Sequence, residues 1–324
     1  MIKRLARCIR EYKWTALVSP LAMVGEVAME VTIPLVMADL YDYGIAARNM
    51  NIVVEKALLL MLCAVVSLFF GILSAIYASK AATGFARNLR HDMYYKVQDF
   101  SFANIDKFSS ASIVTRLTSD VANLQMAFQM CIRMAIRCPM MLILAMVSSL
   151  RISPKLSSVY FVAIPILAVV LLGIVPLVFN IFDRVFKTYD RLNTVVQENV
   201  HGIRVVKSFV REDKEVDKFT AISQSIYRDF CKAEHILAVN NPVMQFCVYG
   251  CILAISWIGA HLVVASGNNA NLGLTTGELS SMFTYTTQIL TALMMFSMVF
   301  VMTIMARSPL RRCYEILVEE PSLA

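Results

Sequence analysis

Six long apolar runs constrain this chain more than any other feature of its 324 residues. A helix rises about 1.5 Å per residue, so roughly 20 apolar residues cross a hydrocarbon core of about 30 Å. Hydrophobic residues make up 58% of the chain and charged residues 16%, whereas soluble domains average about 45–50% and about 25%. The sequence therefore predicts an all-α membrane protein with six transmembrane helices. The runs cover residues 14–38, 57–79, 135–150, 156–182, 237–266 and 279–306.

The positions of lysine and arginine predict how these helices are oriented. Residues 1–13 contain five of them, residues 80–129 six, residues 183–236 ten and residues 307–324 three, whereas the connections on the opposite side contain four. Because cytoplasmic connections carry an excess of positive charge, we expect a multi-pass protein of the cell membrane with both termini in the cytoplasm. The net charge of +7 follows from this topology and from attraction to an anionic inner leaflet, so we expect no nucleic-acid partner.

The remaining composition argues against chemistry within this chain. Its eight cysteines are scattered without a Cys-x-x-Cys pair, and we interpret them as small apolar fillers. The phosphate-binding pattern Gly-x4-Gly-Lys-Ser/Thr does not occur. We therefore predict no metal site, no catalytic residue, no cofactor and no enzymatic activity for the chain as given.

The N-terminal segment, residues 1–13, has the pattern of an interfacial helix that lies on the membrane surface and ends at Trp14. Its cationic face contains Lys3, Arg7 and Arg10, and its apolar face contains Ile2, Leu5 and Ile9. At the other side of the bilayer the connections are short. Gly273 and Gly277 indicate a turn before the sixth span, not a helix-dimerisation motif.

The two connections predicted in the cytoplasm are long and helical. Residues 80–104 contain no proline and a single glycine, and their apolar residues recur at helical spacing. The second span is therefore expected to continue as one helix through residues 56–104, roughly 70 Å, more than twice the bilayer core. Residues 184–200 and 219–235 show the same pattern. We expect long cytoplasmic extensions with a short insert at each tip.

The first insert covers residues 102–125. Its serine-rich stretch after Phe108 is expected to break the helix. We expect Ser110 or Ser112 to cap a short helix through Leu117, and Asp120 to help cap the next one.

The second insert covers residues 198–219. Gly202 is expected to break the helix, with apolar and cationic faces on either side, and residues 209–218 to form a charged helix with Phe219 as an anchor. A short amphipathic helix of this kind suits recognition by a groove on a partner.

These inserts resemble the two intracellular loops of ATP-binding cassette (ABC) exporters. The second loop of that family contains Glu-x3-Gly-Ile-Arg-Val-Val-Lys-x-Phe, which matches Glu198 to Phe209. The first contains Arg-Leu-Thr-x-Asp, which matches Arg116 to Asp120, although Ala111 and Ser112 replace the preceding Gly-Asp. The C-terminal RSPLRRCYEILVEEPSL resembles the linker to the ATPase domain. In this order and spacing the matches cover nearly the whole chain.

The resemblance implies an elbow helix at residues 1–13, a six-helix domain at residues 14–318, and at residues 319–324 the start of a linker to a nucleotide-binding domain. That domain, fused downstream or separate, would bind ATP and Mg²⁺. A second membrane half, identical or different, would exchange its fourth and fifth helices with this one. The residues expected to couple to the nucleotide-binding domain are Ser112, Arg116, Leu117, Asp120, Gly202, Phe209, Arg211, Glu212 and Phe219.

Charged residues within the spans are the candidate substrate site. Glu26 and Glu30 lie one turn apart on one face of the first span, where an ionised group needs a cavity or a partner. They are interpreted either as contacts for cationic substrates or as a packing pair within the bundle. Arg137 is a further candidate. Met294, Phe296 and Met298 form either an adaptable wall for hydrophobic ligands or a lipid-facing stripe.

The sequence therefore favours the membrane subunit of an ATP-driven exporter for hydrophobic or amphipathic substrates (drugs, lipids or peptides), working by alternating access. The stretches IPLVMADLYDYGI and IRCPMMLILAMVSSLRISPKL are most similar to multidrug-type half-transporters of Gram-positive bacteria. The alternative is a membrane scaffold or regulatory subunit that has this fold without the ATPase.

Overall fold

The computed structural model describes residues 4–5, 7–268 and 273–320. In these ranges every regular element is helical. The elements in chain order are η1 (Arg7–Tyr12), α2 (Lys13–Asp39), η2 (Leu40–Ile45), α3 (Met50–Gln98), α4 (Phe102–Phe108), α5 (Ser110–Thr115), η3 (Arg116–Asp120), α6 (Val121–Ile152), α7 (Pro154–Ser208), α8 (Glu212–Ala238), α9 (Asn240–Ser266), α10 (Thr276–Met305) and α11 (Arg307–Val318).

Six helical stretches of the described residues are long and apolar enough to cross a membrane, which confirms the six predicted spans. They are Arg7–Ile45, Met50–Gln98, Ser110–Ile152, Pro154–Ser208, Glu212–Ser266 and Thr276–Val318. The predicted continuation of the second span is also confirmed: α3 is one uninterrupted helix of 49 residues, although it ends at Gln98 rather than Asn104.

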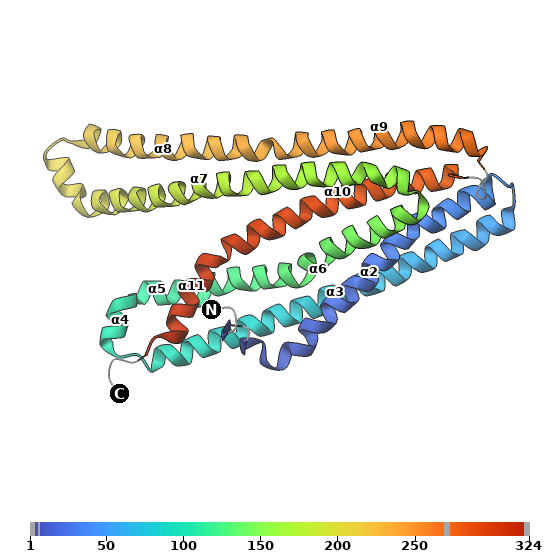
Figure 1. Ribbon diagram of the computed structural model, residues 1–324. Coiled ribbons are helices and arrows are strands. Elements are labelled where there is room, and N and C mark those ends of the chain that lie inside the picture. Colours follow the sequence, from blue (N-terminus) through green and yellow to red (C-terminus); the bar gives the residue numbers. More distant parts are fainter. Residues whose placement is uncertain (1–3, 6, 269–272, 321–324) are drawn as a thin grey trace. The chain divides into compact units, whose positions relative to one another are not determined.

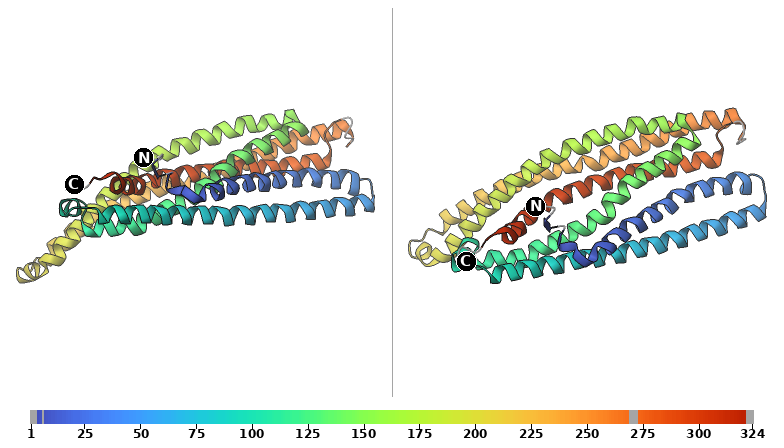
Figure 2. Two further views of the ribbon diagram at one scale, coloured as in Figure 1. Left: turned by 90° about the horizontal axis from the view of Figure 1, so that it is seen from below. Right: turned by 60° about the horizontal axis from the view of Figure 1, so that its bottom comes forward.

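The chain divides into two compact units: Met1–Val162 with Cys251–Ala324, and Ala163–Gly250. In the first unit α2 and α3 lie side by side, and α6 packs against α2, α3 and α10 (Figures 1 and 2). Small residues allow α2 and α3 to approach closely, and the Ser19 hydroxyl donates a hydrogen bond of 3.0 Å to the Ser74 carbonyl. Large apolar residues of α3, such as Leu62 and Phe69, remain exposed, as expected for a helix that faces lipid.

The loop end of the first unit has its own apolar core. Buried residues of α3, the segment of residues 102–120, α6 and α11 meet the N-terminal residues Leu5 and Cys8 there. The N-terminal segment is helical, as expected, but it is a short 3₁₀ helix with non-helical dihedrals at Arg10. Leu5 is therefore buried in protein rather than in lipid. Lys3 and Ile2 lie outside the described residues.

At the opposite end of the first unit, Asp42 of η2 holds the start of α10. Its carboxylate accepts hydrogen bonds from the Thr275 hydroxyl at 2.5 Å and the Gly277 amide at 3.0 Å. A side chain at Gly277 would lie 2.5 Å from the Ala38 carbonyl oxygen, so only glycine permits this approach. Thr275 and Glu278 form a capping box at the start of α10. Of the two glycines predicted in the turn before the sixth span, Gly273 lies before this helix, whereas Gly277 lies within it.

Residues 102–120, which we call the first loop, contain α4, α5 and η3. The predicted break after Phe108 is confirmed at Ser109, whose φ is 57°. The predicted caps are wrong: Ser109 caps α5 by accepting a hydrogen bond from the Ser112 amide. η3 continues into α6 without a capping hydrogen bond from Asp120, whose carboxylate binds elsewhere.

In the second unit, α7 and α8 run antiparallel and are joined at residues 208–212, which we call the second loop (Figure 1). Two expectations are wrong here. α7 continues through Gly202 to Ser208, and the helix expected from Phe209 begins only at Glu212. The turn places Val210 at φ 52°, a left-handed conformation that is unusual for a β-branched residue. The Arg184 guanidinium binds the Asp229 carboxylate at 2.9 Å and ties the two helices together.

Candidate functional site

Three charged residues from two helices form an ion cluster within the spans of the first unit. The Arg137 guanidinium of α6 donates to Glu26 Oε1 at 2.6 Å and to Glu30 Oε2 at 2.7 Å, both on α2. The two carboxylates lie one turn apart, so a single planar guanidinium reaches both. The sequence placed these residues in the spans; the structure brings them into contact.

A cavity of about 280 Å³ opens beside this ion cluster. Of the predicted cavity residues, Glu30 and Arg137 line it, and Glu26 is held by Arg137 just behind. In the sixth span the methionine that lines the cavity is Met295, and the predicted Met294, Phe296 and Met298 do not line it; Phe296 and Met298 are exposed. The other lining residues are Cys138, Met141, Thr287, Gln288, Thr291 and Ala292.

The ion cluster contains two carboxylates and one guanidinium, so with all three groups ionised it carries one negative charge in excess. Two acceptors beside it, Glu26 Oε2 and Gln288 Oε1, are buried and have no hydrogen-bond partner. Buried acceptors without donors are costly, and a cation or a hydrogen-bond donor relieves that cost. The cavity is therefore suited chemically to a positively charged or donor-rich group attached to an apolar body. Across the described residues, no group of three His, Cys, Asp or Glu side chains comes close enough to hold a metal ion.

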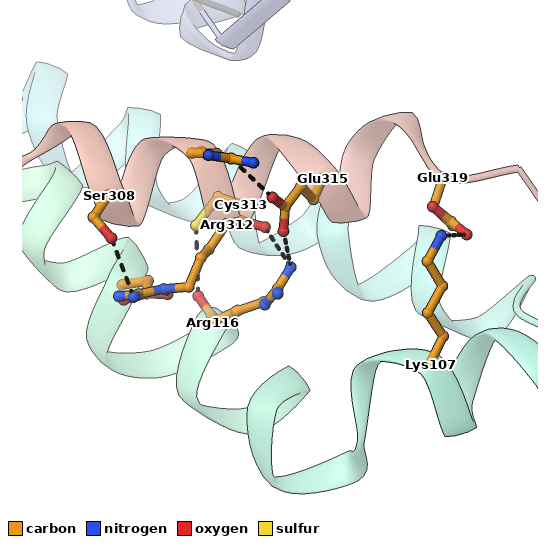
Figure 3. A network of polar contacts seen from close by, with 9 residues as sticks. Lys107, Arg116, Ser308, Arg312, Cys313, Glu315 and Glu319 are labelled. Atoms are coloured by element: carbon orange, nitrogen blue, oxygen red, sulfur yellow. Dashed lines mark hydrogen bonds and ion pairs between the residues drawn. The ribbon is translucent and has the colours of Figure 1, made fainter. Parts of the chain in front are cut away.

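Two of the predicted coupling residues of the first loop, Arg116 and Asp120, bind α11, and Figure 3 shows Arg116 beneath that helix. Asp120 is 1% exposed and Arg116 is 9% exposed, and both bind groups of α11. Leu117 packs against the apolar core at this end, and the Ser112 amide closes the turn at Ser109. Arg116 and Asp120 are therefore buried and bind groups of the same chain, so they do not lie on the surface.

Of the predicted coupling residues in and around the second loop, Phe209, Arg211 and Phe219 are exposed, whereas Gly202 and Glu212 are half-buried. Phe209 is 72% exposed and Phe219 is 42% exposed, while Arg211 precedes α8 and Gly202 lies within α7. Glu212 accepts a 2.9 Å hydrogen bond from Lys207 across the turn, and that bond lowers the pKa of the Glu212 carboxyl. The turn therefore presents an aromatic side chain beside a fixed ion pair.

Sequence reasoning missed two sets of residues at these sites. In the cavity it missed Gln288 and its threonine neighbours, although an amide within an apolar span was a visible signal. At the first loop it missed Arg312 and Glu315, the α11 partners of Asp120 and Arg116. The charges of α11 are spaced as on an amphipathic helix, but nothing local in the sequence identifies what they bind.

The fold and the ion-lined cavity define a multi-pass helical membrane protein with long extramembrane helices. Residues 17–304 match the family model described as ABC transporter transmembrane region, and the chain belongs to that family. It is an exporter-type transmembrane domain with six spans.

Curated relatives include two proteins of Bacillus subtilis (strain 168). The uncharacterized ABC transporter ATP-binding protein YfiB is 29% identical over 96% of this chain and 53% of its own length. The uncharacterized ABC transporter ATP-binding protein YknU of the same organism is 26% identical over 99% of this chain and 54% of its own length. An ATP-dependent lipid A-core flippase of Pseudoalteromonas translucida is 19% identical over 79% of the chain and 46% of its own length. The chain spans about half the length of the curated relatives it matches.

Proposed function

We propose that this domain is the membrane-spanning part of an ATP-driven exporter that moves hydrophobic or amphipathic substrates out of the cytoplasm by alternating access. The observation that carries the proposal is the cavity beside Glu30 and Arg137, which joins apolar walls to two carboxyl groups that share one guanidinium within the spans. Such a cavity favours cationic amphiphiles, because their charge meets the carboxylates and their apolar body meets methionine and alanine side chains.

ATP and Mg²⁺ belong, in this proposal, to an associated nucleotide-binding domain, fused after this segment or separate. The chain has no phosphate-binding loop of its own, so its residues do not fit the nucleotide. Its contribution is to receive the conformational change, and the second loop presents Phe209 and Val210 to such a partner at 72% and 80% exposure. A second membrane half of the same or another sequence completes the exporter.

The ion cluster also suggests that a cationic substrate competes with Arg137 for the carboxylates of Glu26 and Glu30. Arg137 already occupies the carboxylates as a tethered cation, so an incoming amine replaces or shares its hydrogen bonds. Substitutions at the two kinds of charge should therefore act in opposite directions.

The test is ATP-dependent uptake into inside-out vesicles that contain the complete transporter. Glu26→Gln with Glu30→Gln should raise the KM for cationic amphiphiles about tenfold or more, because a hydrogen bond to a charged group contributes about 1.5–3 kcal/mol. Arg137→Gln should lower it, and neutral amphiphiles should respond little to either change. Equal effects on cationic and neutral substrates would make the ion cluster structural. Absence of ATP-dependent uptake by the wild type would favour the scaffold alternative.

Orientation is tested separately with single cysteines in intact cells. We propose that both termini and both loops face the cytoplasm. A membrane-impermeant maleimide should then label Arg48→Cys in the connection before α3 and miss Lys214→Cys in α8. Labelling of Lys214→Cys from outside would reverse the orientation and remove the basis for docking at the second loop.

A further inference from the structure

The helix α11 and the first loop exchange ion pairs in both directions (Figure 3). Arg312 of α11 binds both oxygens of Asp120, at 2.7 Å from Nε and 2.5 Å from Nη2. Arg116 of the loop binds Glu315 of α11 at 3.1 Å and donates to the Arg312 carbonyl at 2.8 Å. A bidentate arginine–carboxylate pair fixes the orientation of both partners as well as their separation.

A third ion pair extends this contact beyond the end of α11. The Lys107 ammonium of α4 lies 2.6 Å from Glu319 Oε1, and this pairing lowers the pKa of the Glu319 carboxyl. The Asn104 amide donates to the same carboxylate at 3.3 Å and to the Glu320 carbonyl at 3.1 Å. The loop therefore holds α11 from Arg312 to the residues that follow the helix.

Apolar packing beneath the ion pairs makes the contact rigid. Cys313 and Ile316 of α11 are fully buried and belong to the same core as Phe108 and Ile113 of the first loop. The Arg116 guanidinium lies over the Phe108 ring, 4.9 Å from its centroid. Two arginines and two carboxylates balance in charge at the centre of the contact, so it leaves no excess charge for a ligand, unlike the ion cluster in the spans.

We propose that α11 and the first loop move as one body, and that Arg312 and Asp120 are positioning residues that carry displacements of α11 into α3 and α6. The first loop connects α3 to α6 along the chain, while α11 follows α10 after a turn at Ala306. A shift of α11 is thereby transmitted to α3 and α6 as well as to α10. This inference rests on the proposed function in one respect only: that a nucleotide-binding domain supplies the displacement.

The surface of the first loop that a partner could contact does not include the motif residues Arg116 and Asp120, because both bind α11. The outward surface consists of side chains such as Phe102 and Val114, which are 87% and 59% exposed. A nucleotide-binding domain would touch this outer surface, and α11 would fix where that surface is held.

The first experiment compares two neighbouring arginines of α11 in the complete transporter. Arg312→Gln should lower the amount of substrate transported per ATP hydrolysed about fivefold or more, the lower end of typical coupling between sites. Arg312→Lys keeps the charge and should recover part of the loss. Arg311→Gln is the matched control, because Arg311 is largely exposed and forms its ion pair with Glu315 of its own helix. Equal coupling in the Arg312→Gln and Arg311→Gln proteins would overturn the proposal.

The second experiment does not depend on transport. Nitroxide labels at Lys107→Cys and Glu319→Cys, in a background without the eight native cysteines, report the distance between the first loop and the end of α11. The distance distribution should be unchanged between nucleotide-free and ATP-vanadate-trapped protein, and a short bis-thiosulfonate cross-link between the two sites should leave transport at the level of the same double-cysteine protein before cross-linking. A change in the distance, or reversible inhibition by the cross-link, would show that the two parts move separately. If the wild type transports nothing, the proposed function fails, while the distance measurement still decides this inference.

Discussion

The two loops of this domain both connect long helices, but their predicted coupling residues differ in exposure. Each is a short polar and apolar segment at the tip of a helical pair. In the first loop the charged motif residues are buried, with Asp120 1% exposed beneath α11. In the second loop Phe209 is 72% exposed and follows a helix that is joined to its neighbour by ion pairs such as Lys218–Glu198 and by aromatic contacts such as Tyr189–Phe230. The first loop is therefore a contact within the chain, whereas the second loop is a surface suited to a partner.

Backbone geometry supports the same distinction. Val210 adopts φ 52° at the tip of the second loop, a strained conformation for a β-branched residue, and is 80% exposed. The left-handed turn closes the end of α7 through hydrogen bonds from the Val210 amide to the Lys207 carbonyl and from the Arg211 amide to the Val206 carbonyl, while the Val210 side chain stays exposed. Ser109 has a similar φ of 57° in the first loop, but its side chain caps α5. The side chain at the left-handed position is therefore used for capping in the first loop, whereas in the second loop it is exposed and available to a partner.

The largest expected effect is on coupling at the second loop. Phe209→Ala in the complete transporter should lower substrate-stimulated ATPase activity and transport about tenfold or more, because truncating an aromatic anchor of an interface costs about 2 kcal/mol or more. ATP binding and thermal stability should be unchanged, since the side chain is exposed. Tyr227→Ala, at an exposed position of α8 away from the turn, is the control. Full stimulation in the Phe209→Ala protein would remove the second loop from the interface.

The next effect is on stability and should appear at the first loop. Asp120→Ala leaves the Arg312 guanidinium without its carboxylate, and we expect a loss of about 2 kcal/mol after allowing for the partial exposure of Arg312. The unfolding temperature of the detergent-solubilised protein should fall by about 4 °C or more. Glu212→Ala, which removes an exposed partner of Lys207 in the second loop, should leave it unchanged. Equal shifts for the two variants would erase the contrast between the loops.

The smallest effect concerns thiol reactivity under α11. Burial first, and then the neighbouring Asp120 carboxylate, raises the pKa of the Cys313 thiol from 9.0 to about 12. Since the thiolate is the reactive form, alkylation of Cys313 at pH 8 should be slow and should rise about tenfold per pH unit up to near pH 12. Asp120→Asn removes a charge that opposes the thiolate and should speed the reaction. Alkylation of native Cys313 as rapid as that of Cys231, a partly exposed thiol of α8, would show that the contact opens readily.

Much of the architecture could be predicted because its causes are local. The length of each apolar run sets a span, and the proline-free pattern of residues 80–98 sets the extension of α3. Prediction from local sequence failed at the break between α7 and α8, where the intrinsic helix propensity of one residue did not decide where the helix ends. Gly202 remains within α7 because a glycine costs only about 1 kcal/mol in a long helix, and the break falls instead at Phe209–Arg211.

The sequence by itself determined the class of protein, the number of spans and which charged residues lie within them. Only the tertiary structure decided what those charges bind. Arg137 and Glu26 are 111 residues apart, and Arg312 and Asp120 are 192 residues apart. Pairing over such distances depends on how whole helices pack, because a buried charge accepts whichever partner the fold brings within hydrogen-bond reach. The same residue types therefore form an ion cluster beside a cavity in the spans and a set of ion pairs between α11 and the first loop.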